Sequence, residues 1–147
     1  MGKINLVRVV MGGLVAGVVI NVFEFVLNGY FLANDWRDLM DALHLPQLGM
    51  NEVLWFVALG FVAGFAAVWT YAAIRPRFGA GPKAAVYAAL LTWVTAYVLT
   101  NAFPMVSGTE SPAIAHTAMI VGLIEIIAAT LAGAFVYRES DQGPSTA

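Results

Sequence analysis

Two acidic residues lie in stretches of the sequence that are otherwise apolar enough to be surrounded by lipid. Glu24 lies between Asn21 and Asn28, and Glu125 lies in the last apolar stretch of the chain. An ionisable side chain at mid-membrane costs about 2.5–3.5 kcal/mol on insertion scales, so such a residue is expected to have a function. Two neighbouring carboxyl groups can share a proton or, with amide oxygens as further ligands, bind a small cation. We therefore predict an ion- or proton-binding site made of Glu24, Glu125, Asn21 and Asn28.

The polar residues of the first apolar segment share one face of the predicted helix. At about 100° of rotation per residue, this face covers a sector of about 80° and also contains two glycines. A face without bulky side chains allows another helix to approach closely, so it should point toward protein. Its members are Gly13, Gly17, Asn21, Glu24 and Asn28.

Glu125 lies on a similar face of the last apolar segment. At a rise of about 1.5 Å per residue, Glu24 and Glu125 lie at compatible depths below the same membrane surface. If the first and last helices are neighbours, the two carboxyl groups can approach each other. The alternative is that Glu24 is neutral and hydrogen-bonds to Asn21, Asn28 or a backbone carbonyl, holding helices together without any transport role. The small residues around Glu125 are Ala118, Gly122, Ala129 and Ala132, with Gly133 at the edge.

Two further polar residues are candidate contacts at the outer mouth of the bundle. His116 lies one turn into the last segment, although about 180° around the helix from Glu125. The alternative for His116 is a solvated side chain in the membrane interface. Asn101 lies one turn from Tyr97 in the third segment, and the two could line the same outer cavity. The alternative is that both side chains serve only in helix packing.

Glycines at helical spacing predict close contacts between helices. Such contacts can join helices of one chain or bind another membrane protein. The glycines that we expect at these contacts are Gly13, Gly17, Gly60, Gly64, Gly122 and Gly133.

The composition is that of a membrane protein. Of 147 residues, 61% are hydrophobic and 11% are charged, and the mean hydropathy is +0.80. Soluble domains are much less apolar and carry about 25% charged residues. The net charge of −2 offers no basic surface, so nucleic acid is not an expected partner.

The residues that are missing argue against an enzyme. The chain contains no cysteine, which excludes thiol catalysis, disulfides and iron–sulfur ligation. Its two histidines, His44 and His116, are too few for a histidine-rich metal centre. We therefore expect no enzyme activity, no cofactor and no metal site.

Four segments are long enough to cross a bilayer, which requires about 20 apolar residues per helix. We expect one domain over residues 1–139, an all-α bundle of four transmembrane helices. Asn51 is the predicted cap of the second helix, while Gly81-Pro82 and Ser111-Pro112 are expected to begin the third and fourth. The predicted spans are residues 6–31, 52–74, 83–103 and 113–137.

The basic residues predict the orientation. Most of them fall before the first span, between the second and third spans, or after the fourth, and Arg37 alone falls on the opposite side. This bias puts both termini in the cytoplasm. Residues 34–44 should form a short amphipathic helix in the outer membrane interface after the first span. Residues 140–147 should form a disordered cytoplasmic tail.

Three stretches resemble small bacterial integral membrane proteins with four helices and no known function. They are GLVAGVVINVFEFVLN at 13–28, YAAIRPRFG at 71–79 and AATLAGAFVYRE at 128–139. The resemblance implies a multi-pass protein of the bacterial inner membrane. It implies no activity, ligand or partner.

These observations favour a small membrane protein that binds or moves protons or a small cation or solute. The alternative is an accessory or assembly subunit that binds another membrane protein through its glycine-rich faces. The expected partners are membrane lipids and either further copies of the chain or another membrane protein. An intramembrane enzyme is the third hypothesis, with no nucleophile and base visible in the sequence.

Overall fold

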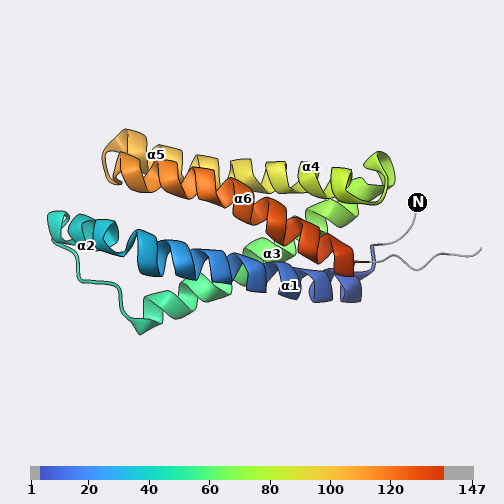
Figure 1. The fold of residues 1–147 in the computed structure, drawn as a ribbon, viewed down its shortest axis with the longest axis horizontal. Helices are drawn as coiled ribbons and strands as arrows, with labels where there is room; N and C mark the ends of the chain where they lie inside the picture. The colour runs from blue at the N-terminus through green and yellow to red at the C-terminus, as the bar shows by residue number, and fades with distance from the viewer. Residues whose placement is uncertain (1–3, 138–147) are drawn as a thin grey trace, which may run out of the picture.

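The structure is a computed structural model that describes residues 4–137, and in this range it contains helices and turns but no strand (Figure 1). Four of its helical segments are long and apolar enough to cross a membrane. This confirms the all-α prediction and indicates a multi-pass membrane protein. The four segments are Leu6–Phe31, Met50–Phe78, Pro82–Ser107 and Pro112–Val136.

Two of these segments contain a π-helical turn. The first consists of α1 (Leu6–Val26) and the π turn η1 (Leu27–Phe31), and the short helix α2 (Ala33–Ala42) follows it. The third consists of α4, η2 and α5 in succession. The remaining elements are α3 (Met50–Phe78), α4 (Pro82–Trp93), η2 (Val94–Val98), α5 (Leu99–Ser107) and α6 (Pro112–Val136).

The start of α3 differs from the prediction. Asn51 was expected to cap this helix, but the N-cap is Gly49, and the Glu52 carboxylate accepts a hydrogen bond of 2.8 Å from the Gly49 backbone N–H. The prediction was wrong because a side chain inside the first turn reaches back to the chain before the helix. The other two predicted starts are confirmed, since Pro82 begins α4 and the Ser111 hydroxyl caps α6.

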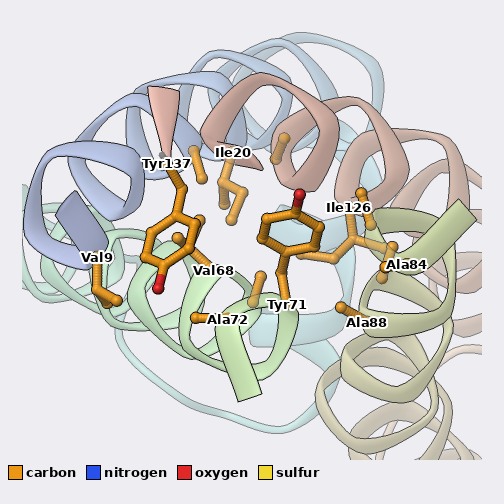
Figure 2. Packing of buried hydrophobic residues seen from close by; sticks show 14 of the residues in the cluster. Val9, Ile20, Val68, Tyr71, Ala72, Ala84, Ala88, Ile126 and Tyr137 are labelled. Atoms are coloured by element: carbon orange, nitrogen blue, oxygen red, sulfur yellow. The ribbon is translucent and has the colours of Figure 1, made fainter. Parts of the chain in front are cut away.

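The helices pack so that the first and last spans are neighbours. α1 lies against both α3 and α6, and α4 lies against α3 and α6. Figure 2 shows the centre of this packing, where Val68 and Tyr71 of α3 lie close to Ile20 of α1 and Ile126 of α6. Several fully buried positions are alanines, and their small side chains let the helix axes come close together.

The predicted packing glycines contact helices of the same chain. A Cβ added at Gly64 of α3 would lie 2.7 Å from the carbonyl oxygen of Gly13 and 2.8 Å from the Cα of Gly17, both in α1. A Cβ at Gly133 of α6 would lie 2.8 Å from the carbonyl oxygen of Gly12. The glycine-rich faces are therefore occupied within the molecule.

The two ends of the bundle differ in charge and in packing. The turn between α3 and α4, with Arg75 and Arg77 just before it, lies at the same end as the start of α1, whereas α2 lies at the opposite end (Figure 1). At the α2 end, residues 51–59 of α3 are all exposed. The predicted tail at residues 140–147 lies outside the described residues.

Candidate functional site

Glu125 is completely buried in the bundle. Its side chain is 0% exposed on α6, and its Oε1 accepts a hydrogen bond of 2.6 Å from the Tyr97 hydroxyl. Its other oxygen, Oε2, is buried and has no hydrogen-bond partner among the described residues. A buried polar atom without a hydrogen-bond partner costs free energy, so this unpaired oxygen requires an explanation.

Tyr97 reaches Glu125 because of two local features. It lies in the π turn η2, which contains one residue more than an α turn and so changes the direction of the side chains that follow. Its ring lies over Gly122 of α6, where an added Cβ would collide with the ring carbons. Gly122 therefore provides the space that Tyr97 occupies.

Glu24 is half-buried on α1 and is held by Asn28. The Asn28 side-chain amide donates to Glu24 Oε2 and, at 3.2 Å, to the Glu24 backbone carbonyl. Asn28 lies in the other π turn, η1. Both acids are thus hydrogen-bonded to a side chain in a π turn, and π turns are often found at functional sites.

Asn28 in turn connects Glu24 to α2. The Trp36 indole N–H donates a hydrogen bond of 2.9 Å to Asn28 Oδ1. A continuous series of hydrogen bonds therefore runs from Trp36 through Asn28 to the Glu24 carboxylate.

The structure brings Glu24 and Glu125 within range of direct Coulomb interaction. Glu24 also interacts electrostatically with the Tyr97 hydroxyl. This follows from the packing of α1 against α6, which sequence periodicity alone does not specify. The hydrogen bonds define two groups of side chains, one of Glu24, Asn28 and Trp36 and the other of Tyr97 and Glu125.

The other predicted site residues lie elsewhere. Asn21 faces α3, where its amide donates to the Val57 carbonyl at 3.2 Å and lies against Gly60. Asn101 donates to the Tyr97 carbonyl at 2.7 Å, within its own helical segment. His116 is exposed on α6.

Sequence reasoning missed Tyr97 and Trp36 as partners of the acids. The sequence places Tyr97 one turn from Asn101, either lining the outer mouth or in packing, and not beside Glu125. The signal for its position was Gly122 on another helix, which leaves space for a ring. Trp36 follows Asn28 by eight residues, which on an ideal α-helix would put the two side chains about 80° apart. The π turn removes this mismatch, and no pattern of apolar residues predicts it.

The side chains that contact the two carboxylates are hydrogen-bond donors. Both neighbours of the carboxylates, Asn28 and Tyr97, present N–H or O–H donors to them, and the Asn28 amide oxygen already accepts from Trp36. Within residues 4–137, no group of three or more histidine, cysteine, aspartate or glutamate side chains could hold a metal ion. A cation site would instead need several oxygen acceptors directed at one point.

Comparison of the chain with models of known protein families, with curated proteins and with solved structures finds no match.

Proposed function

We propose that this chain is a small integral membrane protein that binds and exchanges a proton at the pair Glu24 and Glu125. The observation that carries the proposal is the fully buried Glu125 carboxyl. One of its oxygens accepts a hydrogen bond from the Tyr97 hydroxyl, and the other has no hydrogen-bond partner in the described chain. An ionised carboxylate in such a place is costly, and a proton on the free oxygen removes the charge. The nearby Glu24 carboxyl provides a second position for the proton.

The depth of the two acids supports a route from the α2 end. Glu24 lies about 10 Å from the end of its span near α2, at a rise of about 1.5 Å per residue. It is half-buried, whereas Glu125 is completely buried. In this proposal Glu24 exchanges protons with water at the α2 end, and Glu125 receives them in the interior.

Infrared difference spectroscopy of the reconstituted protein across pH tests this function. We expect two carboxyl C=O bands, one lost in Glu24→Gln and the other in Glu125→Gln. Each substitution should also change the pH at which the remaining band titrates, because the two charges interact. Glu52→Gln, at the exposed start of α3, is the matched control and should leave both bands unchanged. Two independent carboxyls, or bands that never respond to pH, would overturn the proposal and leave Glu24 as a helix-packing residue.

A second candidate is an accessory subunit that binds another membrane protein. The glycine faces are occupied within the chain, but the first turns of α3 offer another surface, where Met50, Leu54, Trp55 and Phe56 are exposed. If this surface binds a partner or a second copy, Trp55→Ala should release it during purification in mild detergent. Glu24→Gln should then have no effect on the complex.

We also propose that both termini lie in the cytoplasm of a bacterial cell, with α2 at the outer interface of the inner membrane. The support is the basic character of the end that carries Arg8, Arg75, Arg77 and Lys83, since cytoplasmic loops are enriched in lysine and arginine. Fusions of a periplasm-active phosphatase and of a cytoplasm-active fluorescent protein to Ala147 test the orientation. Fluorescence without phosphatase activity is expected, and the reverse would place the termini outside.

A further inference from the structure

We propose that Trp36 is a positioning residue for Glu24 and that its hydrogen bond makes α2 a cover whose closure depends on the ionisation of this acid. The inference rests on the proposed proton site, and it adds regulation by α2. It starts from the hydrogen bonds that join Trp36 to Asn28 and Asn28 to Glu24.

The contacts that hold α2 in place are few. None of its ten residues is buried. Trp36 and Leu39 pack against a small cluster formed by Leu27, Leu32 and Ile114, separate from the main core. The chain after α2 is exposed from Leu43 to Leu59. A helix held by so small a cluster can separate locally at low cost, because the free energy of local opening follows the apolar contacts that are lost.

The protonation state of Glu24 decides which hydrogen bonds Asn28 can make. An ionised Glu24 only accepts, so the Asn28 amide donates to it and keeps its oxygen free for the Trp36 N–H. This donation to a charged acceptor also polarises the amide and strengthens its bond from Trp36. A protonated Glu24 no longer polarises the Asn28 amide, and its O–H can donate to the second lone pair of Asn28 Oδ1, so this oxygen becomes a weaker acceptor for the Trp36 N–H. Proton uptake from water at the α2 end therefore weakens the hydrogen bond by which Trp36 holds α2 in place, and proton release restores this hydrogen bond.

Several other ionisable groups lie near these hydrogen bonds, and their effects must be distinguished from that of Glu24. Glu125 of α6 and Tyr97 of η2 interact with Glu24 electrostatically. At the same end of the bundle, Glu52 lies in the first turn of α3, and His116 is exposed on α6. Burial raises the pKa of Glu110 in the turn before α6. The remaining charged groups are those of α2 itself, Asp35, Arg37, Asp38 and Asp41.

The four tryptophans make a sharp test possible. Each indole N–H gives one signal in a 15N–1H NMR spectrum of the reconstituted protein, and Trp36→Phe identifies the signal of Trp36. Trp93 is the internal control. Its indole N–H donates a hydrogen bond of 2.8 Å to the Met119 backbone carbonyl, and no acidic side chain takes part in this hydrogen bond. We expect the Trp36 signal to move with pH along the same curve as the Glu24 infrared band, while the Trp93 signal stays fixed.

Two variants decide the outcome. In Glu24→Gln the Trp36 signal should no longer titrate, although Glu110, His116 and the α2 acids are intact. In Trp36→Phe, which keeps the ring packing, the proton affinity of Glu24 should change about three- to tenfold, as expected for one lost hydrogen bond. If the infrared titration persists but Trp36 never responds, or responds equally in Glu24→Gln, the cover is refuted while the proton site stands. If the infrared titration itself is absent, both proposals fail.

Discussion

Tyr97 and Gly122 depend on each other, because the ring fills the space that a side chain at position 122 would need. Glu125 depends on both, since Tyr97 is its hydrogen-bond donor. A methyl group added at position 122 of α6 can therefore displace Tyr97 and so disturb Glu125 without contacting it.

We expect Gly122→Ala to displace the Tyr97 ring and to lower the free energy of unfolding by about 1–3 kcal/mol, as for an overfilled core. The Glu125 infrared band should shift because its donor moves. The matched control is Gly29→Ala, where the nearest atom to an added Cβ is a Phe25 ring carbon at 3.8 Å. Gly29→Ala should leave the free energy of unfolding unchanged or raise it by up to about 1 kcal/mol. Equal effects of the two substitutions would contradict the assigned role of Gly122.

The two acids and Asn28, the partner of Glu24, were identifiable from the sequence, but Tyr97 and Trp36 were not. Glu24 and Glu125 stand out because charged residues are rare in apolar spans. The direction of Asn21 toward α3 and of Tyr97 toward Glu125 depends on which helix lies beside each one. That information comes from packing, which one sequence with helical periodicity does not contain.

At the scale of helices, α1 and α3 are joined by backbone contact at small residues. Gly64 lies against Gly13 and Gly17, and Asn21 adds a hydrogen bond to the Val57 carbonyl. The spacing of these glycines predicted close contacts, and the structure identifies the partners as helices of one chain.

Gly64→Ala should separate α1 from α3, because the new methyl group would meet backbone atoms that cannot rotate away. We expect a loss of about 1–3 kcal/mol in unfolding free energy, measured by denaturation in mixed detergent micelles. Val62→Leu enlarges a side chain that is 60% exposed on the same helix and should change stability by less than about 0.5 kcal/mol. A Gly64→Ala protein as stable as the wild type would show that the two helices are not in contact at this point.

The helix boundaries show which local signals are reliable. Proline in the first turn and a serine cap correctly marked the starts of α4 and α6. The start of α3 was misplaced because Gly49 has no side chain to recognise, and the cap depends on Glu52 reaching backward. The end of α3 was placed too early, since the helix continues through Pro76 to Phe78. Proline near a helix end removes a hydrogen bond without stopping the last turn.

At the scale of the whole molecule, the apolar exterior is uneven along the bundle. Large apolar side chains are exposed on all four spans, and every residue from Met50 to Leu59 of α3 is exposed. The composition predicted a membrane protein, but only the structure shows which part of the surface lacks protein contacts.

Quenching of tryptophan fluorescence by lipids with brominated acyl chains can map this surface. In single-tryptophan variants, Trp55, which is 72% exposed, and Trp69, which is 51% exposed, should be quenched strongly. Trp93 is half-buried and hydrogen-bonded to α6, so its quenching should be weaker. If Trp55 were protected while Trp69 was quenched, a second copy or another protein would cover the start of α3.

The π turn between α1 and α2 has a further consequence for the length of the chain. It contains one residue more than an α turn, so deleting one residue after Asn28 within Leu27–Phe31 would restore the ordinary helical pitch. Asn28 and the tryptophan would then be seven residues apart, and seven residues of α-helix turn by about 700°, within about 20° of two full turns. The tryptophan would therefore keep its direction toward Asn28, and Glu24 and Asn28, which precede the deletion, would keep their hydrogen bond. The π turn thus lets the helix contain one additional residue while α2 stays connected to Glu24.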